Sequence, residues 1–229
     1  KKTLNFIWGN QSSILVGDYI LSRCFEMMVD DGDQEVLKLL SSTSAEISQG
    51  EVLQLQHKGE IDMIEETYLK IISAKTASLF AAATKVGSIL SKKENKTKEA
   101  LEFYGKNLGL TFQIADDALD YNSELKLFGK EIGNDFYEGK ITLPIILLYQ
   151  KANKDEKKDL KQFFEKKERS ENEFKQVLIL IKKYNIINEC YKKAEHFINL
   201  ASNSLSIFKE SREKEILKNL TSFSIERSF

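Results

Sequence analysis

A short segment rich in aspartate carries the clearest chemical signal in this sequence. It reads Phe112-Gln113-Ile114-Ala115-Asp116-Asp117-Ala118-Leu119-Asp120-Tyr121. On a helix, Gln113, Asp116, Asp117 and Asp120 are three or four positions apart and share one face. Three carboxylates on one face repel one another unless a cation lies among them. Because Mg²⁺ binds a few carboxylate oxygens together with water and substrate phosphates, the segment predicts a Mg²⁺ site for a phosphorylated substrate. A solvent-exposed acidic helix end is the alternative.

Three lysines provide the positive charge that a diphosphate bound to Mg²⁺ still requires. Lys75 lies in the segment Ser73-Ala74-Lys75-Thr76-Ala77, inside an otherwise apolar helical pattern. Lys130 and Lys140 follow the aspartates, in GKEIGND (129–135) and EGKITLP (138–144). Taken alone, a lysine in an apolar helix can simply extend its ammonium group to the surface. Together with the carboxylates, the lysines favour a diphosphate as the ligand.

These segments, in this order and spacing, resemble the trans-isoprenyl diphosphate synthase family. FQIADDALDY is similar to the second aspartate-rich motif of that family. The other matching segments are AKTASLF, GKEIGNDFYEGKITLP, WGNQSSILVGDYILSR, GEVLQL at 50–55 and the terminal TSFSIERSF. The WGNQSSILVGDY and GEVLQL segments are most similar to long-chain members such as octaprenyl diphosphate synthases. The resemblance extends over the whole chain.

The resemblance implies a role for each candidate residue. Asp116, Asp117 and Asp120 would hold Mg²⁺ on an allylic diphosphate, and Lys75, Lys130 and Lys140 would neutralise that diphosphate. The Gln113 amide oxygen, the Thr76 hydroxyl and the Lys75 carbonyl would stabilise the allyl cation. Isopentenyl diphosphate would then attack the cation. The expected product is a long-chain all-trans polyprenyl diphosphate, with a quinone side chain as its end use.

Three alternatives remain open at this point. The first is a short-chain synthase that makes farnesyl or geranylgeranyl diphosphate. The second is a non-catalytic subunit of a heteromeric synthase, which would be expected to have lost Asp116, Asp117 or Lys75, although all three are present. The third is a class I terpene cyclase, which shares a DDxxD metal site but would usually lack the ordered downstream lysines.

The resemblance also implies that several family parts precede Lys1. These are the first aspartate-rich motif, the arginine pair after it and the residues that bind isopentenyl diphosphate. We therefore expect residues 1–229 to be a single polyprenyl synthase domain that lacks its N-terminal helices and first motif. We also expect the natural chain to extend upstream.

Helical periodicity dominates the elements that must position these residues. The chain contains one Pro and eleven Gly, which favours long helices over a turn-rich β fold. The expected helices cover 12–29, 34–57, 61–91, 97–121, 140–151, 156–167, 171–183, 187–209 and 213–226. The fold predicted is all-α, a multi-helix bundle of the isoprenoid synthase type around a central cavity.

The helix at 12–29 is apolar on most faces, which predicts that it is buried nearly all round. Since family members pair through this region, we expect a homodimer.

The composition excludes several classes of partner. The net charge is −1 and the pI is near 6.3, which indicates no binding of nucleic acid. The longest apolar stretch, 143–149, is too short to cross a membrane, so no transmembrane segment is expected. Cys24 and Cys190 have no neighbouring metal ligands, and we interpret both as buried thiols of a cytoplasmic protein. His57 and His196 match no catalytic position.

Overall fold

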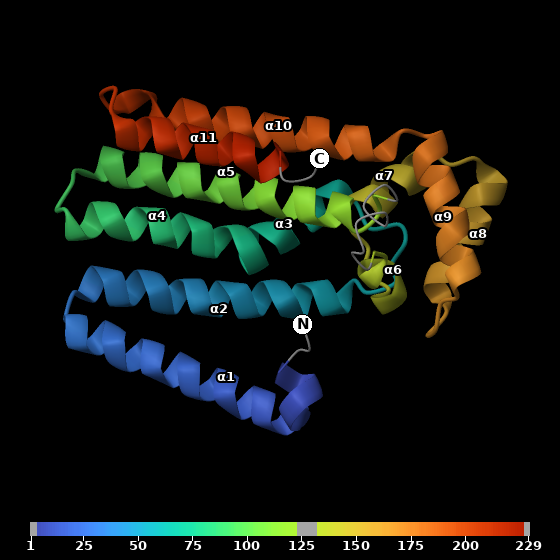
Figure 1. Cartoon of the computed structure of the whole chain (residues 1–229), viewed down its shortest axis with the longest axis horizontal. Coiled ribbons are helices and arrows are strands. Elements are labelled where there is room, and N and C mark those ends of the chain that lie inside the picture. Colours follow the sequence, from blue (N-terminus) through green and yellow to red (C-terminus); the bar gives the residue numbers. More distant parts are fainter. Residues whose placement is uncertain (1–3, 123–131, 227–229) are drawn as a thin grey trace. The chain divides into compact units, whose positions relative to one another are not determined.

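The structure, a computed structural model, describes residues 4–122 and 132–226, and every regular element in these ranges is helical (Figure 1). The elements are α1 (Leu4–Asp31), α2 (Gln34–Gln56), α3 (Glu65–Ile72), the π-helix η1 (Ser73–Ala77), α4 (Ser78–Leu90), α5 (Asn95–Leu119), α6 (Asn134–Glu138), α7 (Leu143–Lys151), α8 (Lys154–Glu165), α9 (Glu171–Lys183), α10 (Ile186–Ser204), the 3₁₀-helix η3 (Leu205–Ile207) and α11 (Arg212–Glu226). The prediction of an all-α fold is confirmed for these residues. None of the described helices is both long and apolar enough to span a bilayer.

The chain divides into two compact units, Lys1–Ser42 and Thr43–Phe229. The smaller unit contains α1, which begins earlier than predicted and is interrupted at Gly9, where φ is 80°. No residue of α1 is buried, so the prediction that this helix is buried nearly all round is wrong for the chain by itself. Apolar periodicity predicts that a surface will be covered, but it does not specify which chain covers it. The prediction of two buried thiols is also wrong for Cys24, which is exposed, whereas Cys190 is buried.

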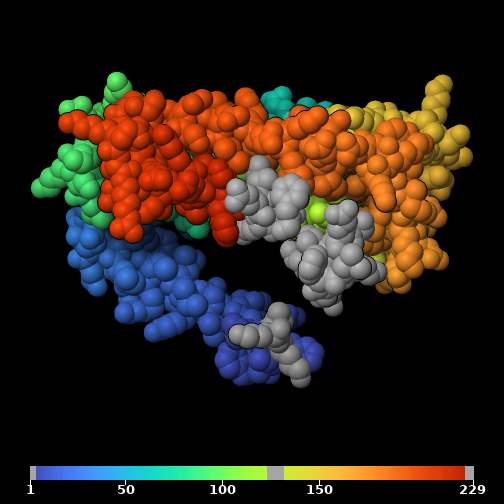
Figure 2. Space-filling view, turned by 45° about the horizontal axis from the view of Figure 1, so that its top comes forward, coloured from blue at the N-terminus to red at the C-terminus, as the bar shows by residue number. Residues whose placement is uncertain are grey.

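In the larger unit, α5 is the central helix, and α4 and α10 pack along its length (Figure 1). Helices α10 and α11 lie side by side on one face of this unit (Figure 2). Two glycines on α5, one turn apart, let its neighbours approach closely. A Cβ at Gly105 would collide with the Phe80 carbonyl of α4, and a Cβ at Gly109 would lie 2.6 Å from the Ala77 Cα of η1. The backbones of α4 and η1 therefore rest directly on α5.

The helix predicted over 61–91 is three elements, because a five-residue π-helix, η1, interrupts it. A π-helix bonds residue i to i+5 and inserts an extra residue without changing which side chains are apolar, so helical periodicity does not reveal it. The Ser78 hydroxyl donates to the Ala74 carbonyl at 2.6 Å within this widened turn. Lys75 and Thr76 both lie in η1, so the local geometry of the candidate site depends on it.

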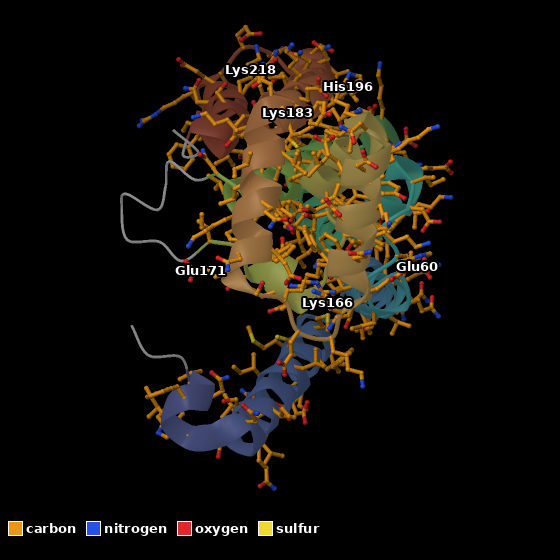
Figure 3. All side chains as sticks on the ribbon, turned by 90° about the vertical axis from the view of Figure 1, so that its right-hand side faces the viewer. Glu60, Lys166, Glu171, Lys183, His196 and Lys218 are labelled. Atoms are coloured by element: carbon orange, nitrogen blue, oxygen red, sulfur yellow. The ribbon has the colours of Figure 1, made fainter. Side chains whose placement is uncertain are left out.

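Helices α8 and α9 begin with capping boxes that the sequence encodes directly. The side chains of Asn153 and Ser170 accept backbone N–H groups of the first helical turn, and Glu156 and Glu173 bond back to the cap residues. Two ion pairs join the helices, Lys166 with Glu173 and Lys183 with Glu156. Figure 3 shows the two lysines, Lys166 and Lys183, at opposite ends of this helix pair. These local signals account for α9 having its predicted bounds.

Helix α6, Asn134–Glu138, was not predicted. It is too short for a periodic pattern, and it lies between Gly133 and Gly139, whose φ values are 91° and 74°. These φ values favour glycine at both positions, and a Cβ there would also crowd side chains, lying 2.6 Å from the Phe174 ring at Gly133 and 2.6 Å from the Arg169 guanidinium at Gly139.

Candidate functional site

The C-terminal end of α5 presents the three aspartates in three different environments. Asp116 is exposed, and its side chain makes no hydrogen bond or ion pair with other described residues. Asp117 is buried, with 4% of its surface exposed. Asp120 is the C-cap residue that follows α5. Among the described residues, no three His, Cys, Asp or Glu side chains converge on one point that could hold a metal ion. The shared helical face therefore does not form one ready-made metal site.

Both carboxylate oxygens of Asp117 accept hydrogen bonds from protein groups. The Tyr68 hydroxyl of α3 donates to Oδ2 at 2.7 Å, and the Gln113 Nε2 donates to Oδ1 at 2.8 Å. Burial raises the pKa of Asp117 to about 7, with Asp135 and then Asp116 adding to the increase, while the two hydrogen bonds oppose it. The protein thus holds a carboxylate here in surroundings that disfavour its negative charge.

Asp120 connects the end of α5 to the start of α6. Its Oδ1 accepts the backbone N–H groups of Gly133 at 3.1 Å and Asn134 at 3.2 Å, and its Oδ2 accepts that of Asp135 at 2.8 Å. The Gly133 N–H also donates to the Asp120 carbonyl at 2.9 Å. These bonds bring the Asp135 side chain to the acidic end of α5.

Asp135 is a functional candidate that sequence reasoning did not select, although it lies in the GKEIGND segment. Burial raises the pKa of its carboxyl, and the charges of Asp120 and Asp116 raise it further. The signal in the sequence is weak, because Asp135 is separated from α5 by a segment of unpredicted conformation. Asp116, Asp117, Asp120 and Asp135 together form what we call the acidic cluster.

Lys140 is the described lysine that contacts this cluster. Its Nζ lies 2.7 Å from Glu138 Oε2 and 3.4 Å from Asp135 Oδ1. Burial acts to lower the pKa of Lys140, but the hydrogen bond to Glu138 and the charge of Asp135 outweigh it and raise the pKa. Lys140 is therefore a stable cation beside the cluster. Lys130 lies outside the described residues.

Thr76 and Gln113 belong to the same hydrogen-bonded chain as Asp117. The Thr76 hydroxyl donates to Gln113 Oε1 at 2.8 Å, and the Nε2 of the same amide donates to Asp117. The chain therefore runs from Thr76 of η1 through Gln113 and Asp117 of α5 to Tyr68 of α3. Tyr68 was not selected from the sequence, where the only signal is that a buried tyrosine hydroxyl needs a partner.

The ammonium group of Lys75 contacts side chains of α2. Its Nζ donates to Gln54 Oε1 at 2.9 Å and lies 3.7 Å from Glu51 Oε1. Helix α2 can come this close because a Cβ at Gly50 would lie 2.5 Å from the Lys75 backbone nitrogen. The GEVLQL segment at 50–55 thus has a structural role, in which its glycine and polar side chains hold the lysine of η1. His57 and His196 belong neither to the acidic cluster nor to the described contacts of Lys75.

The donor set of the acidic cluster suits a hard divalent cation. Mg²⁺ binds oxygen ligands, and it usually keeps several waters and shares substrate phosphates. Asp116 offers a carboxylate with no described protein partner, and Asp117 and Asp135 have pKa values raised partly by neighbouring carboxylates. A cation would relieve this repulsion. The residues present therefore fit a metal that is completed by a phosphorylated ligand.

Comparison with known proteins gives a consistent picture. A family model described as "Polyprenyl synthetase" matches residues 1–181. The all-trans-nonaprenyl-diphosphate synthase (geranyl-diphosphate specific) of Rhodobacter capsulatus is 36% identical over 227 residues, which cover 99% of this chain and 69% of that protein. The octaprenyl diphosphate synthase of Escherichia coli is 43% identical over 146 residues, which cover 64% of this chain and 45% of that protein.

A solved structure also matches closely. The polyprenyl synthase of Caulobacter crescentus, complexed with calcium and isoprenyl diphosphate, aligns with a TM-score of 0.93 at 36% sequence identity. The alignment covers 98% of this chain and 69% of that structure. The bundle is therefore of the isoprenyl diphosphate synthase type, as the motifs predict.

Proposed function

Since this chain belongs to the polyprenyl synthetase family of trans-prenyltransferases, we propose that it condenses isopentenyl diphosphate with an allylic diphosphate to make a long-chain polyprenyl diphosphate. The observation that carries the proposal is the acidic cluster at the end of α5, within segments that the family model covers. Its Asp116 carboxylate, which has no partner among the described side chains, lies in the motif where a metal-bound diphosphate is expected. The long-chain product is supported by the similarity to nonaprenyl and octaprenyl synthases.

We propose Mg²⁺ as the metal, held by Asp116 with Asp120 and Asp135 nearby. Enzymes of the family use a divalent metal to bind diphosphate, and one similar structure contains calcium. When bound, Mg²⁺ neutralises the diphosphate and makes it a better leaving group. Asp120 already accepts three backbone N–H groups, so its share in metal binding would be smaller than that of Asp116.

The lysines would bind the diphosphate oxygens that the metal leaves uncovered. Lys140 already lies beside the cluster, and we assign Lys130 to the same role from its motif. Lys75 is held by the neutral Gln54 amide and a longer contact to Glu51, so a diphosphate is a better partner for it than either group. Charge-assisted bonds from three lysines would favour cleavage of the allylic C–O bond.

The η1 turn would stabilise the allyl cation that follows. Gln113 Oε1 and Thr76 Oγ1 are hydrogen-bonded to each other, and both are electron-rich oxygens on partly buried side chains. Two oxygens in a site that excludes water can offset a developing positive charge without reacting with it.

Incorporation of radiolabelled isopentenyl diphosphate into a farnesyl diphosphate primer tests this proposal. The full-length gene product should elongate the primer in the presence of Mg²⁺, and chromatography should show products well beyond geranylgeranyl diphosphate. A farnesyl or geranylgeranyl end product would replace the long-chain assignment with a short-chain one. No incorporation with any allylic primer would contradict the proposed activity.

We also propose that the protein is a homodimer paired through α1. Its exposed apolar side chains include Phe6, Trp8, Ile14, Tyr19 and Ile20, each at least 57% exposed. Covering such a surface with a second copy would remove much apolar area from water. Light scattering at micromolar concentration should give twice the monomer mass, and a monomer would contradict the pairing.

The remaining proposals concern the setting of the reaction. Both cysteines are free, which suits a reducing compartment, and we propose a cytoplasmic location that cell fractionation can check. A quinone side chain is the end use that we propose for a long-chain product, and loss of quinone in cells lacking the gene would support it.

A further inference from the structure

We propose that Asp117 is a positioning residue, anchored by Tyr68, which fixes the orientation of the Gln113 amide and does not bind the metal. This inference rests on the proposed prenyltransferase function, because it assigns Gln113 the role of facing the allyl cation. It separates the adjacent aspartates of one motif into two roles. Asp116 would bind the metal, and Asp117 would organise the oxygen that faces the substrate.

Both oxygens of Asp117 are already bonded to protein groups. Oδ2 accepts the Tyr68 hydroxyl at 2.7 Å and Oδ1 accepts the Gln113 amide at 2.8 Å. The residue is 4% exposed, whereas its neighbour Asp116 is exposed. A metal that keeps several water ligands needs an open carboxylate, so Asp116 fits that requirement and Asp117 does not.

The hydrogen bonds along this chain have a fixed direction. Asp117 Oδ1 accepts from the Gln113 Nε2 at 2.8 Å, as an ionised carboxylate requires, so the NH₂ end of the amide faces Asp117. The amide oxygen must then point the other way, where it accepts the Thr76 hydroxyl at 2.8 Å. If Asp117 did not hold the NH₂ end, the amide could rotate and present that end to the developing cation. The orientation of Gln113 therefore depends on Asp117.

Tyr68 holds the Asp117 carboxylate in place. Tyr68 is 2% exposed and lies in α3, so its hydroxyl is fixed by the packed core around its ring. Burial raises the pKa of Tyr68 well above its ordinary value, and the hydroxyl keeps the proton that it donates. Tyr68 does not touch Gln113 in the described contacts, and its effect on the amide would pass through Asp117.

Three variants of the full-length gene product test this division of roles: Asp116→Asn, Asp117→Asn and Tyr68→Phe. Calorimetric titration of Mg²⁺ in the presence of inorganic diphosphate measures metal binding without turnover. We expect Asp116→Asn to weaken Mg²⁺ binding by about tenfold or more. We expect Asp117→Asn and Tyr68→Phe to leave it within about twofold of wild type. Weakening by Asp117→Asn equal to that by Asp116→Asn would overturn the proposal.

Steady-state kinetics separates positioning from mere support of the fold. Asp117→Asn leaves one acceptor oxygen in place of two, and Tyr68→Phe removes only a hydroxyl. Each of these two variants should lower kcat about tenfold, with little change in the KM of the allylic substrate. A wild-type kcat in Tyr68→Phe would overturn the proposal, and this variant decides alone if the Asp117 variant does not fold.

A double-mutant cycle adds a control that structural damage would not mimic. In a Gln113→Met background there is no amide to orient, so Tyr68→Phe should cause no further loss of kcat. An additional tenfold loss there would overturn the proposal. Absence of elongation by the wild-type protein would instead contradict the proposed function.

Discussion

The acids of α8 and α9 and the acids at the end of α5 show opposite electrostatics. Glu156 and Glu173 accept hydrogen bonds from lysines and from capped backbone groups, and these bonds lower the pKa of each to about 2. Asp117 is buried and Asp135 is partly buried, both lie near other carboxylates, and their pKa values are raised. The first region pairs its acids with lysines, whereas the second places several carboxylates near one another and leaves Asp116 with no described side-chain partner.

This difference is the basis on which we propose that the acids of α8 and α9 serve the fold and those at the end of α5 serve a ligand. Ionised acids at the start of a helix stabilise it, because they accept hydrogen bonds from unpaired N–H groups and interact favourably with the helix dipole. Carboxylates placed near one another are an electrostatic cost that a structure would avoid without a cation to bind. Substitutions in each region can test that distinction.

Asp116→Asn should lower turnover by about a hundredfold or more, since removal of a metal ligand raises the barrier to ionisation by about 3 kcal/mol. Stability should change little, because the side chain is exposed and has no described partner. The matched control is Asp159→Asn, which makes the same chemical change at an exposed position of α8. If both variants lost turnover to a similar extent, the acids of α8 and those of the acidic cluster would not differ in function.

Lys75→Ala should raise the KM of the allylic diphosphate about tenfold, the loss expected for one charge-assisted contact. The KM of isopentenyl diphosphate should change less. Lys85→Ala is the control, since Lys85 of α4 is paired with Glu102 of α5 at 2.7 Å. An effect confined to isopentenyl diphosphate would reassign Lys75 to the other substrate.

Gly50→Ala should lower kcat severalfold and destabilise the fold by about 1–3 kcal/mol, because the new Cβ would press on the Lys75 backbone. Gly87→Ala in α4 is the control. It meets no atom within 4 Å and should be neutral or slightly stabilising. Equal behaviour of the two variants in assays of unfolding and turnover would argue against close packing of α2 on η1.

Glu156→Gln and Glu173→Gln should cause a small loss of stability that depends on pH. The folded pKa of each glutamate is about 2 and its ordinary value is 4.5, so the stabilisation is fully present above pH 4.5. It is lost as the pH falls towards 2. The melting temperature of each variant should therefore lie below wild type at pH 7, and the gap should narrow on acidification.

Glu168→Gln is the control for that series, because Glu168 is exposed and makes no hydrogen bond or ion pair with other described residues. Its melting temperature should follow wild type at every pH. A gap that stays constant between neutral and acidic pH in the Glu156 and Glu173 variants would show that their charge is not what stabilises α8 and α9.

Much of the fold follows from the sequence, because its signals are local. Capping boxes at Asn153 and Ser170 and apolar periodicity are encoded within one helix, and the predicted bounds of α5, α8 and α9 lie within about two residues of those found. The π-helix η1 was not predictable, since its extra residue leaves the apolar pattern intact. The exposure of α1 was not predictable either, because burial depends on a partner surface.

The sequence placed the three aspartates on one helical face, but it did not distinguish their environments. Asp116, Asp117 and Asp120 are equivalent in a helical projection. Their differences come from Tyr68 and from the backbone of residues 133–135, which are distant in sequence from the motif. Long-range contacts therefore decide which carboxylate stays free, and no local pattern contains that information.

One structure would test the central claim most directly, that the acidic cluster at the end of α5 binds a metal-diphosphate. The full-length gene product should be crystallised with Mg²⁺ and an unreactive thio analogue of farnesyl diphosphate. The account predicts an Asp116 oxygen about 2.1 Å from Mg²⁺. It also predicts diphosphate oxygens beside Lys75 and Lys140, with Asp117 still bonded to Tyr68 and Gln113. A diphosphate bound elsewhere, or Mg²⁺ without Asp116 among its ligands, would contradict it.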